Sequence, residues 1–154
     1  MSRNDKEAEP TKIPWIEVEL SSEIEIVGDP GLRQPIDSYH VNIRDGLRRR
    51  YLAKGPCQPR ECNFPKSSLG KFMRKFQVAW FDKFDWLEYS VKKDAAFCLV
   101  CYLFSKGHKH GGDTTFTEVG FKNWKRALDK FKEHVGDTRS AYHGAKIQAS
   151  SFRD

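Results

Sequence analysis

The sequence predicts a small α+β fold in which a β-hairpin is followed by an amphipathic helix that packs against it, a ββα-like order. Two apolar and aromatic runs, residues 86–91 and 95–101, are separated by a short polar segment and indicate the hairpin. Residues 121–135 carry apolar side chains at helical spacing and indicate the helix. Only 38% of the 154 residues are hydrophobic, and small cores often need a metal ion or disulfide bonds.

The start of the chain is acidic and predicts a flexible, disordered leader over residues 1–35. Residues 1–30 contain three Lys/Arg and eight Asp/Glu, a net charge of −5. The remaining 124 residues contain 24 Lys/Arg and 13 Asp/Glu, a net charge of +11. A strongly basic body indicates a polyanionic partner, with nucleic acid first, and a solvated surface is the alternative.

Composition also excludes several classes of protein. No apolar run approaches the roughly 20 residues that cross a membrane, and the beginning MSRNDKEAEPTK lacks the apolar segment of a secretory signal. We therefore expect a reducing intracellular compartment, in which the four cysteines are free thiols or metal ligands.

Residues 36–66 form the predicted lead-in. A short helix over residues 40–53 ends at Gly55-Pro56. The basic run Arg48, Arg49 and Arg50 on this helix would contact phosphate, belong to a nuclear import signal, or form an exposed basic surface. The following Pro-rich segment, residues 56–66, predicts an irregular loop.

Residues 69–84 have apolar side chains at steps of three or four, which predicts a helix up to about Phe76 and core positions at Trp80 and Phe81. In residues 121–135, an apolar stripe including Phe131 faces the core, and Gly136 ends the helix. Basic residues occupy its other faces. We expect phosphate contacts from Lys122, Lys125 and Lys130, and contacts to base edges from Asn123 and Arg126.

Cys98 and Cys101 form a C-x2-C pair at the end of a predicted strand, a spacing that lets two thiolates hold one ion. His134 lies on the core side of the predicted helix and His143 follows it, so the full pattern is C-x2-C-x32-H-x8-H. Zn²⁺ favours four such ligands in a tetrahedron, as in a closed structural site. The final gap is longer than the usual three to five residues or so.

A rival set of ligands consists of four cysteines, with Cys57 and Cys62 joining the C-x2-C pair. His108 and His110 lie in a Gly-rich segment and are expected to be exposed to solvent. No H-E-x-x-H, P-loop or GxGxxG motif is present, so the sequence indicates no catalytic residues, no small-molecule substrate and no enzyme.

The strings WLEYSVKKDAAFCLVCYLF (86–104) and GFKNWKRALDKFKEHV (120–135), followed by His143, resemble the TTF-type zinc-finger domain of hAT transposase-like proteins. Some of these proteins are called MYM-type-zinc-finger-protein-like. Residues 29–40 and 51–65 also resemble the lead-in of plant members, where position 62 is often His rather than Cys62.

The resemblance implies a structural zinc ion held by Cys98, Cys101, His134 and His143, and a nuclear, transposase-derived DNA-binding module. It implies a zinc-finger domain over residues 67–147, followed by a tail over 148–154. The RNase H-like catalytic region of such proteins is expected downstream of Asp154. A zinc-stabilised protein–protein interaction module is the alternative function.

Overall fold

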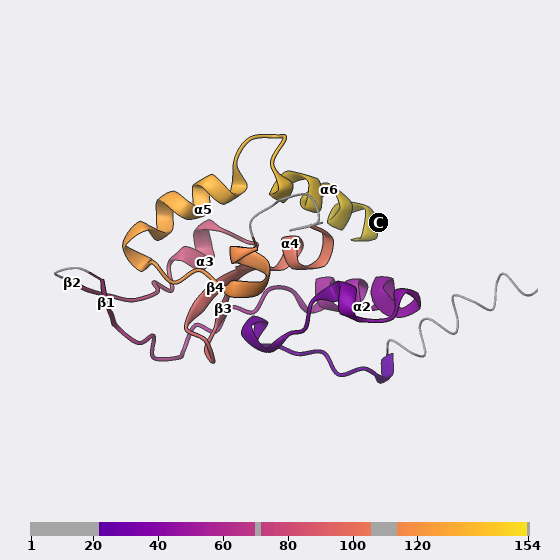
Figure 1. Ribbon diagram of the computed structural model, residues 1–154, viewed down its shortest axis with the longest axis horizontal. Coiled ribbons are helices and arrows are strands. Elements are labelled where there is room, and N and C mark those ends of the chain that lie inside the picture. The colour runs from indigo at the N-terminus through magenta and orange to yellow at the C-terminus, as the bar shows by residue number, and fades with distance from the viewer. Residues whose placement is uncertain (1–21, 70–71, 106–113, 154) are drawn as a thin grey trace, which may run out of the picture.

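The computed structural model describes residues 22–69, 72–105 and 114–153, which form an elongated body of short helices around a central hairpin (Figure 1). One end carries α2 and α6, and the other carries β1 and β2. The helices and strands are α2 (Val41–Lys54), β1 (Ser67–Leu69), β2 (Phe72–Arg74), α3 (Trp80–Lys83), β3 (Leu87–Ser90), β4 (Ala95–Cys98), α4 (Leu99–Phe104), α5 (Ala127–Val135) and α6 (Ala141–Arg153). Short 3-10 turns cover Pro30–Leu32 (η1), Ile36–Ser38 (η2) and Trp124–Arg126 (η5), and a π-helical turn covers Thr115–Val119 (η4).

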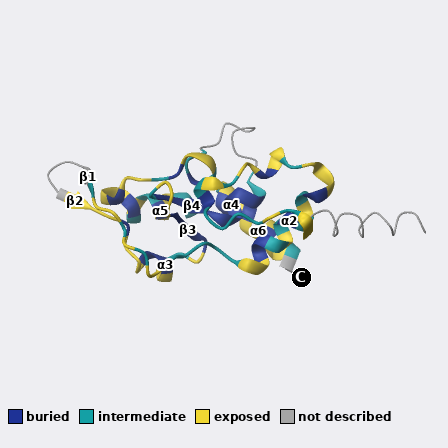
Figure 2. Ribbon diagram, turned by 90° about the horizontal axis from the view of Figure 1, so that it is seen from below, coloured by how far each residue is buried: buried dark blue, intermediate teal, exposed yellow. Residues whose placement is uncertain are grey.

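The predicted hairpin is confirmed. Strands β3 and β4 pair antiparallel, with Leu87 opposite Cys98 and Ser90 opposite Ala95. All eight residues of the two strands are buried, as is most of α4 (Figure 2). The turn ends at Asp94, whose φ of 50° is tolerated by Asp and whose carboxylate accepts a hydrogen bond of 2.5 Å from the Tyr89 hydroxyl.

A dense aromatic core holds the helices on the hairpin. The ring of Phe131 in α5 is fully buried and lies 5.6 Å from Trp80, 5.4 Å from Phe84 and 5.7 Å from Trp86. These rings meet edge to face, the arrangement that aromatic quadrupoles favour. Trp80 and Phe81 are buried, as predicted from the sequence.

The two predicted helices around this core differ from the structure. The helix expected from residue 69 to Phe76 is wrong, because β1 and β2 form a second antiparallel pair there. Gly70 between two three-residue runs disfavours a continuous helix by about 1 kcal/mol. The helix expected over 121–135 begins only at Ala127, because Phe121 is extended and pairs with Ala96 of β4.

The end of the expected flexible leader is also different. Residues 1–21 lie outside the described residues, but the side chain of Arg33 is buried against the hairpin. Its guanidinium forms two hydrogen bonds with the carboxylate of Glu88, of 2.7 and 2.8 Å, and donates to the carbonyls of Val27 and Gly28. The two side chains are 3% and 0% exposed, so the leader is part of the core at this point.

The surroundings of Arg33 keep it charged. Its guanidinium lies over the rings of Tyr51 and Tyr102, 4.8 and 5.1 Å from their centroids. Burial lowers the pKa of Arg33. The hydrogen bonds and the charge of Glu88 raise this pKa by more than burial lowers it, so the net shift is upward. The backbone N–H of Cys57 also donates to Glu88, at 3.0 Å.

We predict that Arg33→Met destabilises the protein by about 3–5 kcal/mol, because it leaves the Glu88 carboxylate buried and unpaired. Urea unfolding followed by circular dichroism measures this change. Replacing both partners, as Arg33→Met with Glu88→Leu, should cost less than the two single changes together. Arg139→Met is the control, since its exposed pair with Asp137 contributes little. A wild-type midpoint for Arg33→Met would contradict the prediction.

Candidate metal centre

Three of the four predicted metal ligands converge. Ligand atoms of Cys98, Cys101 and His134 all lie within 4.8 Å of one another, the one such group among the residues that the structure describes. Cys98 ends β4, and Cys101 lies in the first turn of α4. His134 lies three residues after the buried Phe131, so the packing of α5 on the hairpin carries it to the cysteines.

The geometry of this group fits zinc. The Cys101 Sγ and His134 Nε2 atoms are 3.4 Å apart. A tetrahedral ion with Zn–S of about 2.3 Å and Zn–N of about 2.0 Å would separate such a pair by about 3.5 Å. Two soft thiolates and one imidazole are also the donors that zinc favours, so the chemistry and the spacing agree.

The electrostatics favour one thiolate before any ion binds. The hydrogen bond from Cys98 lowers the pKa of Cys101, burial opposes this, and His134 lowers it further, so the net shift is downward. Burial raises the pKa of Cys98, and its hydrogen bond to Cys101 adds to the rise. A bound cation would stabilise both thiolates in this buried position.

Aromatic side chains enclose the group. The ring of His134 lies 4.9 Å from Trp86, 4.3 Å from Phe116 and 5.7 Å from Tyr142. An open recess of about 260 Å³ is lined by Phe116, Lys130, Glu133 and His134. The apolar walls shield the thiolates from water, which strengthens their attraction for a cation.

The fourth predicted ligand, His143, is outside this group of three in the described residues. It lies at the start of α6, and its ring is 5.4 Å from that of Tyr142. Its Nδ1 atom lies 3.1 Å from the carbonyl oxygen of Val135 and 3.1 Å from the hydroxyl oxygen of Ser140.

The hydrogen bonds around His143 determine its tautomer. The Ser140 hydroxyl uses its single proton on the Val135 carbonyl, at 2.6 Å, and therefore acts as an acceptor toward His143. Nδ1 must then carry the proton, because both of its neighbours are acceptors. A neutral His143 consequently has its lone pair on Nε2, as zinc-binding histidines do when a carbonyl holds the other nitrogen. No spacing in the sequence indicated this role of Ser140.

The rival all-cysteine site is not formed. Neither Cys57 nor Cys62 joins Cys98 and Cys101 in a ligand group within the described residues. The Cys57 Sγ atom lies 3.6 Å from the carbonyl oxygen of Tyr89. The Cys62 Sγ atom lies 3.9 Å from the carbonyl oxygen of Pro59. Burial, followed by the negative charge of Glu88, raises the pKa of Cys57 to about 11, which disfavours the thiolate. His108 and His110 lie outside the described residues.

The predicted nucleic-acid-binding residues fall into two separate groups. Lys122, Lys125 and Arg126 are exposed just before α5, and Lys130 lies on α5, where it pairs with Glu133 at 3.6 Å. The arginines of α2 lie toward the other end of the body (Figure 1). Among the described residues, the two predicted sets therefore lie on different elements.

The arginines of α2 are engaged within the protein. Arg48 donates to the carbonyl of Leu103 at 2.8 Å and pairs with Asp45. Arg50 donates to the carbonyl of Ile24 at 2.7 Å. Arg49 lies over the ring of Phe152 in α6. These contacts favour a structural role for at least Arg48 and Arg50.

No helix in the described ranges has the length and apolar character needed to span a membrane.

No solved structure matches the chain. The family model described as "ZMYM1/FAM200, RNase-like domain" matches residues 114–154, which include His134 and His143. The resemblance had led us to expect the RNase-like region downstream of Asp154. The similarity to that domain model instead begins at residue 114.

Curated relatives extend the similarity toward the N-terminus. Zinc finger MYM-type protein 5 of Homo sapiens is 33% identical over 115 residues, which cover 69% of this chain and 15% of the relative. The protein of the same name from Macaca fascicularis gives the same values, and that of Mus musculus is 34% identical over 97 residues, or 56% of this chain. The chain spans about 15% of the length of the first two. These matches support a relation to ZMYM/FAM200-type proteins.

Proposed function

We propose that this chain is a structural-zinc module that binds nucleic acid, specifically DNA, and is not itself an enzyme. The observation that carries the proposal is the convergence of Cys98, Cys101 and His134 at the junction of the hairpin, α4 and α5. An ion there would tie α5 to β4. The basic residues that precede α5 would then be held in a defined position.

We propose His143 as the fourth zinc ligand. Its Nδ1–H is held by Val135 and Ser140, which leaves Nε2 as the donor. The ligand set would then close with two thiolates and two imidazoles, leaving no position for a reactive water. Zinc in such a site supplies folding free energy and no catalysis.

The proposed DNA contacts come from exposed residues of η5 and the residues before it. Lys122 and Lys125 would neutralise phosphates, which position a protein without reading sequence. Asn123 and Arg126 are exposed in the same segment and would reach base edges. The +11 charge of residues 31–154 supports a polyanionic partner.

The similarity to MYM-type zinc finger proteins supports the zinc part of this proposal. The resemblance to hAT transposase-like proteins supports an origin from the DNA-binding part of a transposase, acting in the nucleus. The match to an RNase-like domain covers 41 residues, which hold no recognised catalytic motif.

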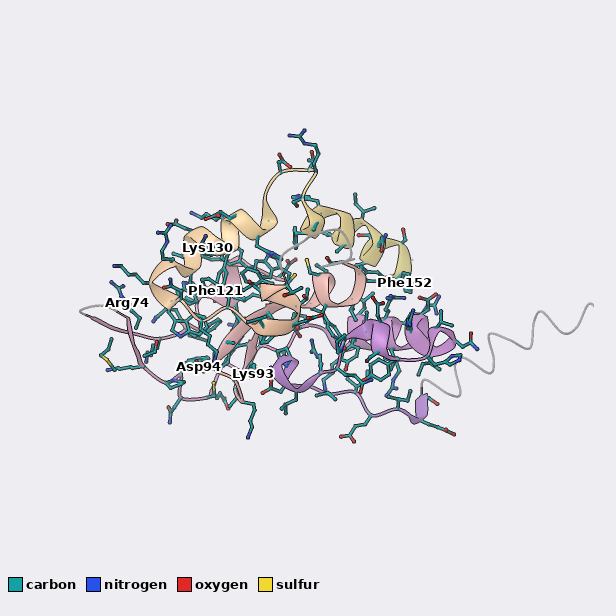
Figure 3. The ribbon with its side chains drawn as sticks, viewed as in Figure 1. Arg74, Lys93, Asp94, Phe121, Lys130 and Phe152 are labelled. Carbon is teal, nitrogen blue, oxygen red and sulfur yellow. The ribbon has the colours of Figure 1, made fainter. Side chains whose placement is uncertain are left out.

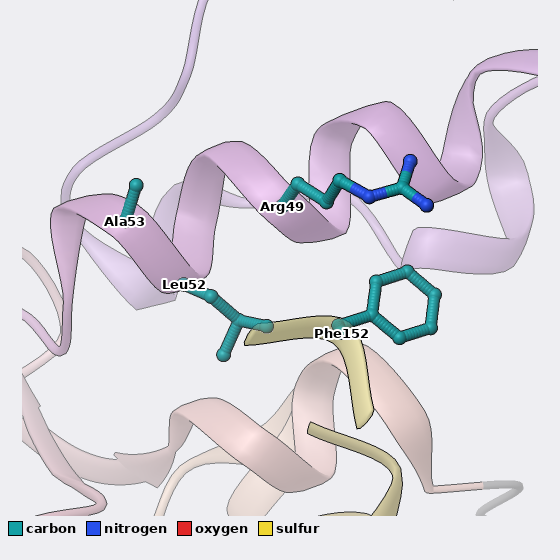
Figure 4. Close-up of a pocket in the computed structure, with 4 residues that line it drawn as sticks. All are labelled: Arg49, Leu52, Ala53 and Phe152. Carbon is teal, nitrogen blue, oxygen red and sulfur yellow. The ribbon is translucent and has the colours of Figure 1, made fainter. Parts of the chain in front are cut away.

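Binding of a protein partner is the second candidate, and one surface feature favours it. Arg49, Leu52, Ala53 and Phe152 line an open recess of about 350 Å³ between α2 and α6 (Figure 4). Apolar walls with one guanidinium at the rim suit a peptide side chain. A partner captured equally well after nuclease treatment would favour this function over DNA binding.

We predict that the purified protein binds one equivalent of zinc and that Cys101→Ser and His134→Ala each abolish this binding. Metal analysis measures the stoichiometry, and circular dichroism measures the accompanying loss of fold. His143→Ala should behave in the same way if His143 is the fourth ligand. Cys62→Ser is the matched control and should keep both zinc and fold. Full folding after exhaustive chelation would refute the zinc proposal.

We predict that Lys125→Ala combined with Arg126→Ala weakens binding to a DNA duplex and flattens its salt dependence. Each lost phosphate contact should reduce the slope of log K against log salt by about 0.9. Fluorescence anisotropy at several salt concentrations measures both effects. Arg139→Ala is the control, because Arg139 is also exposed but lies in the turn before α6. Absence of wild-type binding at about 50 mM salt would reject DNA binding.

A further inference from the structure

The turn between β3 and β4 brings two lysines toward the basic segment that precedes α5. Phe121 and Ala96 of β4 exchange two backbone hydrogen bonds, of 2.8 and 2.9 Å, in an antiparallel bridge. Because the bridge is antiparallel, the chain leaves Phe121 in the direction of the turn that carries Lys92 and Lys93. In Figure 3, Lys93 lies on one side of Phe121 and Lys130 lies on the other. Two basic segments about 30 residues apart in the sequence thus meet at one edge of the hairpin.

Both segments are uniformly positive, and their charged side chains are available to a partner. Residues 91–93 and 121–126 contain five Lys/Arg and no Asp or Glu. All five are exposed, namely Lys92, Lys93, Lys122, Lys125 and Arg126. None of them belongs to an ion pair within the part of the chain that the structure describes. A polyanion would therefore meet five charges that the protein does not itself compensate.

The backbone of the turn is fixed by the protein itself. The N–H of Lys92 donates to the carboxylate of Asp29 at 3.0 Å, and the N–H of Lys93 donates to the hydroxyl of Ser90 at 3.0 Å. The stem of Lys93 lies close to Gly31, where a Cβ atom would be 2.9 Å from the Lys93 Cγ. Since these contacts already order the turn, a ligand of the two ammonium groups need not order its backbone on binding.

The acidic side chains next to the turn are engaged with internal donors. The Asp94 carboxylate accepts a hydrogen bond from the Tyr89 hydroxyl. The Asp29 carboxylate accepts from the N–H groups of Gly31 and Lys92. Neither acid forms an ion pair with a lysine among the described residues. The lysine ammonium groups thus stay free to bind phosphate.

The apolar part of the surface favours a duplex over a single strand. The exposed large apolar side chains of the described residues include no aromatic ring; they are Leu32, Val41, Met73, Val78, Val91, Val119 and Ile147. Proteins that bind single strands without sequence preference use aromatic faces on which the bases stack. A basic surface without such faces suits the phosphate backbones of a duplex, which carries one charge per about 1.7 Å of its axis.

We propose that Lys92 and Lys93 bind the phosphate backbone of the same DNA duplex that residues 122–126 contact. The turn and this segment then form one continuous hairpin surface, made of Lys92, Lys93 and residues 122–126. The inference rests on the proposed function and adds to it a second contact segment and the form of the nucleic acid. Phosphate contacts from two segments would fix the orientation of the protein on the duplex without reading its sequence.

The test compares Lys92→Gln/Lys93→Gln with the control Arg139→Gln/Lys146→Gln in the full chain. Glutamine keeps part of each side-chain stem and removes the charge. The control removes the same charge from exposed positions in α6 and the turn before it. A fluorescein-labelled DNA duplex and its single strand are followed by anisotropy across a salt series. We expect the turn variant to lose about tenfold in duplex affinity and about 1.8 units of salt slope, 0.9 for each contact, while the control binds like the wild type.

Lysine footprinting locates the contact on the wild-type chain and so does not depend on the folding of a variant. The protein is acetylated with and without the duplex, and mass spectrometry measures the reactivity of each lysine. We expect the duplex to protect Lys92 and Lys93 together with Lys122 and Lys125, whereas Lys146 should stay reactive. Circular dichroism should show both glutamine variants folded.

Three results would overturn this inference and leave DNA binding intact. They are a bound duplex that leaves Lys92 and Lys93 reactive, equal loss of affinity in the turn and control variants, and preference for the single strand. Absence of wild-type binding to both probes would instead reject the proposed function.

Discussion

The buried ion pair between Arg33 and Glu88 is the constraint on which the packing of the lead-in depends. The Arg33 and Glu88 side chains are 3% and 0% exposed. Two charged groups so deeply buried are tolerated only when their hydrogen-bond donors and acceptors have partners. Arg33 meets this requirement with Glu88 and two carbonyls, and the Cys57 N–H supplies a further donor to Glu88. One ion pair thereby joins the leader, the Pro-rich loop and the hairpin.

The same hairpin positions the candidate metal centre. Pairing of β3 with β4 places Cys98 at the end of a fully buried strand, and α4 begins at the next residue and brings Cys101 back beside it. Helix α5 contributes His134 because Phe131 is locked among the tryptophans of the core. Apolar packing therefore brings the three donors within reach of one ion.

The candidate metal centre spans the boundary of the segment that matches the RNase-like domain model. Cys98 and Cys101 lie before residue 114, whereas His134 and His143 lie inside the segment that matches the RNase-like domain model. A zinc ion held by all four residues would link the cysteine pair to the histidine-containing segment, which follows it by more than 30 residues in the sequence. Cutting the chain at residue 114 would thus divide the ligand set. The segment from 114 to 154 depends on the hairpin for its packing, since Phe121 pairs with Ala96.

The sequence by itself determined the elements that depend on residues close together in the chain. The turn residues between two apolar runs predicted β3 and β4, Gly55 predicted the end of α2, and C-x2-C at a strand end indicated Cys98 and Cys101 as ligands. Tertiary structure decided what depends on distant partners. Residues 67–69 and 72–74 pair as strands despite helical spacing. The side chain of Arg33 is buried within an acidic leader because Glu88, 55 residues away, needs its charge. The proton position on His143 likewise follows from Val135 and Ser140, which no periodicity reveals. Periodicity reports a local preference, whereas burial and charge compensation are properties of the assembled fold.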